Sequence, residues 1–337
     1  MFSCGFYALE VYVNYIVLDL EWNQCPGGKE KENKDLPFEI IEVGACRLDE
    51  SFNIIDDFHR FVSPVVYRSL HKITKEIINL TMSDLDDGLP FAEAMDEFFD
   101  WCSPEGEDYI FCTWGTMDLT ELQRNCKFFR VNHRFKRPLM YYDVQKLYSI
   151  WHDDGKKRDA LETAIDEQNI EKDIPFHAAV YDAIYTARIM QKIDFDSVKA
   201  YTSIDTYVIP RNRKEEFTVN YGTYSKYISR GFADRDDVMK DSEVNSTRCY
   251  ICGKNARKKI RWFSANQKSH YCLAICEEHG YIKGRIKIKH TDSGLFYASK
   301  VLKVTDDKGA EAIRERQLSA REKRRQRRQR EKLHQWL

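Results

Sequence analysis

The sequence of 337 residues predicts an α/β protein in which helices flank a mixed five-stranded sheet, followed by a small β-rich module and a basic tail. Three observations carry this prediction. The first half opens with three strand-like runs and then alternates strands with helices, an order typical of a mixed sheet covered by helices. Closely spaced cysteine and histidine pairs occur late in the chain, and the C-terminal residues are rich in Arg, Gln and Glu.

Five runs have the length and the apolar or β-branched composition of strands. They are Asn14–Leu20, Phe38–Leu48, Ile54–Ser63, Tyr109–Trp114 and Leu139–Val144. A turn at Asp49–Asn53 joins the second run to the third. Four segments have the apolar spacing of helices. They are Phe91–Cys102, Leu119–Phe129, Ala160–Gln168 and Ala178–Lys192.

The composition is that of a soluble protein. Hydrophobic residues make up 42% of the chain, which is enough for a packed core. Apolar runs such as Ile16–Leu20 are far shorter than the roughly 20 residues of a membrane helix, and Met1–Val13 lacks the basic residues of a secretory signal. Six cysteines are scattered through the first half, as expected for reduced thiols. We therefore expect a cytoplasmic protein with no membrane partner.

Charge is unevenly distributed along the chain. Residues 313–332 hold ten basic and three acidic residues, a net of +7, so the remainder sums to −8 of the total −1. An acidic body with a basic tail suggests that one end binds a polyanion. A solvated helix or a frayed terminus is the ordinary alternative.

Acidic residues recur at the ends of the predicted strands. Asp19 and Glu21 lie two apart in a strand, so their side chains project from one face. Asp118 begins a predicted helix, where an N-cap role is the simpler explanation. His177 precedes a helix that contains Asp182, and a histidine there is commonly only a polar cap. Together, four carboxylates and one histidine match the needs of two-metal phosphodiester hydrolysis, with Mg²⁺ or Mn²⁺ preferred by oxygen ligands.

Three stretches of the chain carry these residues in order: Ile16-Val17-Leu18-Asp19-Leu20-Glu21-Trp22, Trp114-Gly115-x-x-Asp118 and His177-Ala178-x-x-x-Asp182-Ala183. In them the chain resembles the DEDDh 3′-5′ exonucleases of the ribonuclease H-like superfamily. The resemblance is closest to the ERI-like and KapD-like members, and it spans about residues 14–193. One departure is Pro175-Phe176, where many members have a glycine shortly before the histidine.

The resemblance implies a role for each of these residues. Asp19 would bridge two Mg²⁺ or Mn²⁺ ions, with Glu21 and Asp182 binding one of them. Asp118 would hold the second ion through water, and His177 would be the general base. The implied activity is exonucleolytic hydrolysis of single-stranded nucleic acid, with RNA favoured and DNA possible.

Trp22 follows the first two carboxylates directly. The resemblance places it in the pocket for the terminal nucleotide, where an aromatic ring could stack on any base. A core position at the end of a strand is an equal alternative for Trp22.

A second set of residues has the spacing of zinc ligands. Cys249-x2-Cys252 is followed by Cys276-x2-His279, two short pairs separated by a loop. Four such ligands leave no open position, so we expect one structural Zn²⁺ in a zinc-ribbon-like module. Cys272 is a possible replacement for Cys276 or His279, and a redox pair is the competing interpretation of Cys249 and Cys252.

We therefore expect four segments. Residues 14–195 form the exonuclease domain, 196–246 a linker with local structure, 247–305 the zinc-ribbon-like module, and 306–337 a basic tail that is helical or disordered. Lys and Arg alternate with Ile in Ile282–Lys289 and lie among aromatic residues, which favours a nucleic-acid platform over a merely solvated strand. The alternative function is a non-catalytic nucleic-acid-binding or scaffold protein, and an endonuclease on the same fold is a third possibility.

Overall fold

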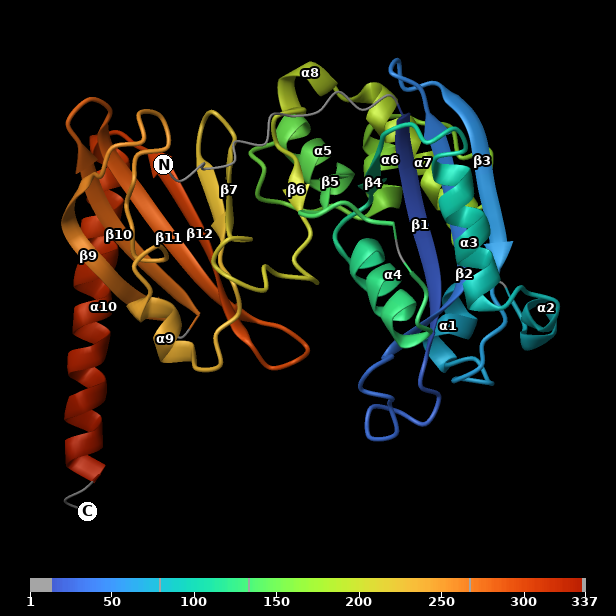
Figure 1. Ribbon diagram of the computed structural model, residues 1–337, viewed down its shortest axis with the longest axis horizontal. Coiled ribbons are helices and arrows are strands. Elements are labelled where there is room, and N and C mark those ends of the chain that lie inside the picture. The colour runs from blue at the N-terminus through green and yellow to red at the C-terminus, as the bar shows by residue number, and fades with distance from the viewer. Residues whose placement is uncertain (1–13, 79, 133, 267, 335–337) are drawn as a thin grey trace. The chain divides into compact units, whose positions relative to one another are not determined.

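The computed structural model describes residues 14–334 except for residues 79, 133 and 267 (Figure 1). The interpretation of Met1–Val13 concerns residues outside this range. The chain divides into two compact units, a first that ends at Tyr207 and a second that begins at Val208. Each unit has its own six-stranded sheet.

The first unit contains a mixed six-stranded sheet with the order β3-β2-β1-β4-β5-β6. Its strands are β1 (Asn14–Gln24), β2 (Phe38–Leu48), β3 (Ile54–Phe61), β4 (Tyr109–Thr113), β5 (Met140–Asp143) and β6 (Ser203–Ile204). β1, β4 and β5 run parallel, whereas β2 and β3 pair antiparallel along the other side of β1. The five expected strands are present. The expected number of five strands is corrected to six by β6, because a strand of two residues is too short to form a detectable sequence pattern.

Helices cover both faces of the first sheet. They are α1 (Lys72–Ile77), α2 (Met82–Asp86), α3 (Phe91–Cys102), α4 (Met117–Phe128), α5 (Val144–His152), α6 (Leu161–Glu167), α7 (Ala179–Lys192) and α8 (Phe195–Val198). One core joins Ile16 and Leu18 of β1 to α3 and α4, and the other joins Val17 to α5, α6 and α7. Alternate residues of a strand face opposite sides, so β1 lies at the centre of both cores.

The second unit contains an antiparallel six-stranded sheet with the order β7-β8-β12-β11-β10-β9. Its elements are β7 (Phe217–Asn220), β8 (Ser225–Ile228), α9 (Arg235–Lys240), β9 (Arg257–Asn266), β10 (Ser269–Cys276), β11 (Gly280–His290), β12 (Phe296–Val304) and α10 (Asp307–His334). The expected linker 196–246 supplies β6 to the first sheet and β7 and β8 to the second. β7 pairs with β8, and β8 pairs with the distant β12, so these four-residue strands are hard to detect from local sequence.

The basic tail is helical along α10, and it packs on one face of the second sheet. Ala310, Ile313 and Ala320 of α10 share a buried cluster with Phe263 of β9 and Leu273 of β10. Small and apolar residues spaced along the helix thus fix it to the sheet. Within the described residues, neither α10 nor any other helix is long and apolar enough to cross a membrane.

Candidate active site and metal centre

Asp19 and Glu21 project from the central strand of the first sheet. Asp19 pairs across the strands with Gly44 of β2, and Glu21 pairs with Glu42. Asp182 lies in the first turn of α7. Ligand oxygens of Asp19, Glu21 and Asp182 all lie within 4.8 Å of one another. Strand and helix thus bring together three of the four carboxylates that the sequence singled out.

Burial and mutual repulsion raise the pKa values of these carboxyl groups. The pKa of Asp19 lies well above its usual range because of burial first, and then because of the charges of Asp118, Glu21 and Asp182. Burial and the charge of Glu42 raise the pKa of Glu21 to about 8. Burial raises the pKa of Asp182 to about 6. Ionised together, these groups require a compensating positive charge.

Asp118 lies beside this trio, in the first turn of α4, and its side chain is buried. Asp118 does not belong to the group of residues whose ligand oxygens lie within 4.8 Å of one another. Among the charged neighbours of Asp19, however, Asp118 contributes most to its raised pKa. Burial raises the pKa of Asp118 itself to about 7, against the opposing effect of hydrogen bonds from backbone amides, including that of Leu20. Asp118, the fourth carboxylate, is therefore close enough to Asp19 of the trio to interact with it electrostatically.

His177 precedes α7 in a left-handed backbone conformation, with φ of 66°. Its backbone N–H donates to Asp182 Oδ2 at 3.3 Å, and its side chain is exposed. Phe176 directly precedes His177, in the stretch where many members of the family have a glycine. Its ring stacks on that of Tyr185, with the ring centroids 4.3 Å apart. The ring of Phe176 holds this loop against α7 while the imidazole of His177 faces solvent.

Two residues of β2 that the sequence analysis missed position α7. Glu42 is buried, and its Oε1 accepts from the N–H of Ala179 at 3.1 Å and lies 2.8 Å from His59 Nε2. A Cβ on Gly44 would lie 2.0 Å from the backbone of Ala179 and Val180. A buried carboxylate and a close backbone approach thus fix the helix that carries Asp182. In the sequence, the role of Glu42 was indicated only by the position of a glutamate within a largely apolar strand.

The carboxylate cluster fits a divalent cation. Oδ1 of Asp182 is buried and has no hydrogen-bond partner among the described residues. Each of the three residues offers a carboxylate oxygen, and oxygen is the ligand type that Mg²⁺ and Mn²⁺ prefer. An unsatisfied buried oxygen beside two other acidic groups is costly without such an ion.

Trp22 is partly buried and packs against the first core. Its ring centroid lies 5.6 Å from that of Phe38. The strand pairing shifts between Glu21 and Trp22, so this ring follows the carboxylates at an irregularity of β1. A stacking role for Trp22 stays a prediction.

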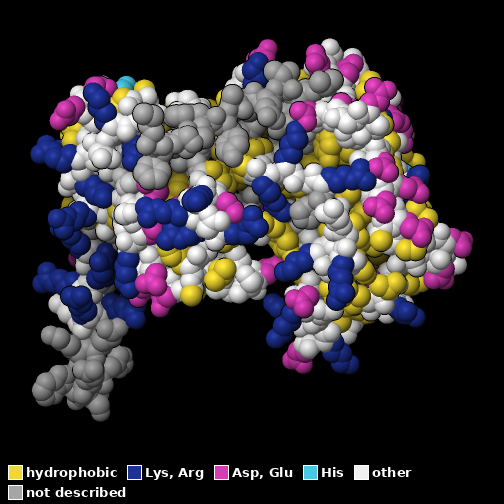
Figure 2. Space-filling view, viewed as in Figure 1, with side chains coloured by type: hydrophobic (Ala, Val, Ile, Leu, Met, Phe, Trp, Pro, Cys, Tyr) yellow, Lys and Arg dark blue, Asp and Glu magenta, His cyan; other side chains and the backbone are white. Residues whose placement is uncertain are grey.

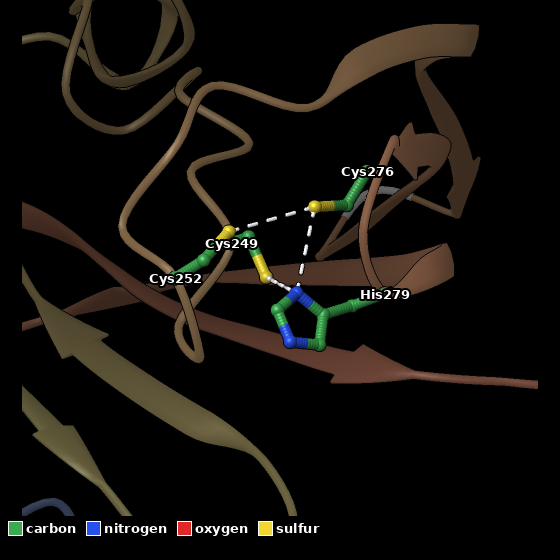
Figure 3. A group of neighbouring side chains, drawn as sticks. All are labelled: Cys249, Cys252, Cys276 and His279. Carbon is green, nitrogen blue, oxygen red and sulfur yellow. Dashed lines mark hydrogen bonds between the residues drawn. The ribbon is translucent and has the colours of Figure 1, made fainter.

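The second unit brings four zinc-type ligands together (Figure 3). Cys249, Cys252, Cys276 and His279 offer ligand atoms within 4.8 Å of one another. Cys252 Sγ lies 3.6 Å from Cys276 Sγ, and His279 Nδ1 lies 3.7 Å from the Sγ atoms of Cys249 and Cys276. A tetrahedron with Zn–S bonds of about 2.3 Å has edges of about 3.8 Å. The donor set therefore fits one zinc ion.

Cys272, the alternative ligand, lies away from this group. It is buried within β10, and a Cβ on Gly284 of β11 would lie 2.6 Å from its Sγ. Glycines with positive φ follow each ligand pair, at Gly253 (73°) and Gly280 (71°). These turns let both members of a pair point to one place.

A mixed sheet on which partly buried carboxylates converge is the arrangement of a candidate metal-dependent hydrolase. The model of the Exonuclease (RNase_T) family matches residues 16–190, more than half of the chain, and the chain belongs to this family. The exonuclease resemblance inferred from the three motifs is thereby confirmed.

Two curated proteins and one solved structure illustrate the similarity. The probable 3′-5′ exonuclease KapD of Bacillus subtilis (strain 168) is 26% identical over 182 residues, which cover 54% of this chain and 84% of that protein. ERI1 exoribonuclease 2 of Mus musculus is 22% identical over 307 residues, covering 83% of this chain but only 41% of that protein. The nuclease domain of 3′hExo, a DEDDh family member bound to rAMP, aligns with a TM-score of 0.49 and 19% identity, covering 59% of this chain and 98% of that one.

Proposed function

We propose that this chain is a metal-dependent 3′-5′ exonuclease that hydrolyses single-stranded nucleic acid, with RNA favoured over DNA. The observation that carries the proposal is the convergence of Asp19, Glu21 and Asp182, whose oxygens lie within 4.8 Å of one another. Family membership supports the exonuclease activity. The 3′-5′ direction is that named for the KapD relative, and RNA is suggested by the name of the mouse relative.

In this mechanism the acidic residues hold two Mg²⁺ or Mn²⁺ ions. Bound ions of this kind supply an activated water and stabilise negative charge on the leaving oxygen. Asp19, Glu21 and Asp182 would be protein ligands of these ions, and Asp118 lies beside Asp19. The exposed imidazole of His177 accepts the proton of the attacking water, while Trp22 lines the pocket of the terminal nucleotide.

Degradation of matched oligonucleotides tests this proposal. Single-stranded RNA and DNA of one sequence, labelled at the 5′ end, are incubated with Mg²⁺ or Mn²⁺ and with the unsubstituted chain, Asp19→Asn or His177→Ala. We expect stepwise shortening from the 3′ end by the unsubstituted chain, none with Asp19→Asn, and a loss of about 10²- to 10⁴-fold with His177→Ala.

Three further outcomes would contradict the proposal. A blocked 3′ end that does not slow degradation would exclude the 3′-5′ direction. Cleavage of a circular strand would indicate an endonuclease. Binding without degradation by both the unsubstituted chain and Asp19→Asn would favour the non-catalytic scaffold.

We also propose that Cys249, Cys252, Cys276 and His279 hold one structural Zn²⁺. The distances between their ligand atoms support a tetrahedral site. Four protein ligands leave no position for substrate, so the role of this ion is to hold the second unit together.

A further inference from the structure

The two units of the chain differ strongly in charge. Residues 208–337 hold 31 Lys and Arg and 16 Asp and Glu, a net of +15, which leaves −16 for residues 1–207 of the total −1. In Figure 2, Lys and Arg side chains gather over the second unit. The acidic first unit repels a polyanionic substrate outside its metal site, whereas the second unit attracts it.

The sheet of the second unit is the centre of this positive charge. Strands β7 to β12 contain eleven Lys or Arg residues and no Asp or Glu. The acidic residues of the neighbouring turns, Glu277, Glu278 and Asp292, lie outside the strands. An extended sheet without acidic residues has no compensating charge of its own.

β11 presents a row of cations on the face where α10 packs. Its buried residues Ile282, Ile286 and Ile288 alternate with Lys283, Arg285, Lys287 and Lys289, which we call the β11 row. Tyr281, on the same side of the strand, packs with α10. Among the described residues, Lys283, Arg285 and Lys287 have no carboxylate partner.

The neighbouring elements extend this row into a wider surface. Lys303 of β12 lies directly opposite Lys283 and thus on the same face. Lys268, with Lys287 and Lys289, lines a shallow hollow of about 620 Å³. α10 adds a cluster of exposed arginines, which includes Arg321, Arg324, Arg325 and Arg328.

The aromatic residues of this region are already engaged, so the surface offers charge rather than stacking. Arg316 covers the ring of Tyr271 at 4.4 Å, and Arg314 lies 5.7 Å from the centre of the Tyr281 ring. Trp262 packs in the core of the other face, and its Nε1–H donates to the carbonyl of Asn245. The aromatic residues that lie among the cations of this module therefore already have partners at these three positions.

We infer that the β11 row and the flanking cations of Lys303, Lys268 and α10 bind the sugar–phosphate backbone of a single nucleic-acid strand without stacking on its bases. Regularly spaced cations along a strand suit regularly spaced phosphates, and such contacts are independent of sequence. The choice of nucleic acid as the polyanion rests on the proposed function. The surface would hold the substrate strand that the acidic unit cannot attract.

Binding to a fluorescein-labelled oligouridylate, measured by anisotropy with the 337-residue chain carrying Asp19→Asn, tests this inference without hydrolysis. The test variant combines Lys283→Gln, Arg285→Gln and Lys287→Gln. The control combines Arg211→Gln, Arg213→Gln and Lys214→Gln, which remove the same charge from an exposed loop of the same unit. We expect at least a tenfold higher Kd in the test variant at low salt, and a change under threefold in the control.

The salt dependence and an abasic strand sharpen the result. Loss of three phosphate contacts should reduce the slope of log K against log salt by about 2, at about 0.7 per phosphate for single strands. An abasic oligonucleotide of equal length should bind within about threefold of oligouridylate. Equal losses in both variants, or a much weaker abasic strand, would overturn the inference.

These outcomes are independent of catalysis. If the unsubstituted chain degrades RNA but the β11 row variant binds normally, the inference fails and the proposed function stands. If binding behaves as expected but no chain degrades RNA, the inference stands and the proposed function fails. Circular dichroism and zinc content confirm that each variant is folded.

Discussion

At the scale of single residues, the raised pKa values of the acidic trio link metal binding to pH. Glu21 has a pKa of about 8 and Asp182 of about 6, both above the values of about 4 that carboxyl groups have in unfolded chains. Between these limits the folded protein binds more protons than the unfolded chain. The free energy of unfolding without metal therefore falls as pH rises from about 4 to 8.

A divalent cation should reverse this loss. We predict that added Mn²⁺ raises the Tm of the first unit more at pH 8 than at pH 6, because its ligands must lose protons to bind it. Thermal unfolding with and without Mn²⁺ measures the effect, with Asp182→Asn as the control. An equal Tm gain at both pH values, or a gain retained in Asp182→Asn, would contradict this prediction.

At the scale of elements, the contact between β2 and α7 holds the site together. Gly44 leaves space for the backbone of Ala179, and Glu42 accepts its N–H. Any side chain at position 44 would push the first turn of α7, and with it Asp182, away from Asp19 and Glu21. The geometry of the site therefore depends on a residue that has no chemistry of its own.

Gly44→Ala tests this dependence. We expect destabilisation of about 1–3 kcal/mol or more from overpacking, a lower Tm, and reduced nuclease activity. Gly27→Ala is the matched control, because the atoms nearest to a Cβ there belong to the flexible side chain of Lys31. If Gly44→Ala retained the stability and activity of Gly27→Ala, this role of the β2–α7 contact would be wrong.

The hairpin of β10 and β11 carries half of the candidate zinc site. We predict about one equivalent of zinc per chain, lost in Cys249→Ser together with the fold of the second unit. Cys272→Ser should retain zinc, because this thiol is buried in β10 away from the ligand group. Metal analysis of the purified variants decides, and zinc that persists in Cys249→Ser or disappears in Cys272→Ser refutes this assignment.

Whether a feature could be predicted from the sequence depends on how local its sequence signal is. β1 and β2 were detectable because their apolar residues are contiguous, and the three motifs because their spacing is short. β7 and β8 were not, since these four-residue strands form only by pairing, β7 with β8 and β8 with the distant β12. Glu42 and Gly44 were missed for a similar reason: their importance lies in a helix more than a hundred residues away in sequence.

At the scale of the whole molecule, separation of charge between the units predicts a dependence on substrate length. A strand long enough to contact both the metal site and the β11 row should have a lower KM than a very short one, with kcat nearly unchanged. Steady-state kinetics on strands of about 5 to 40 nucleotides measure this. The Lys283→Gln, Arg285→Gln, Lys287→Gln variant should lose the dependence on length, and a KM that stays constant in the unsubstituted chain would contradict the prediction.

The apolar seam of α10 ends at Ala320, whereas the nine residues 321–329 that follow are exposed. A protease such as trypsin, which cuts after Lys and Arg, would meet exposed sites in these outer turns. Trimming there would remove much of the arginine cluster, yet leave the packed part of the helix and the cysteine pairs in place. A single cut would thus lower the affinity of the protein for its substrate without unfolding it.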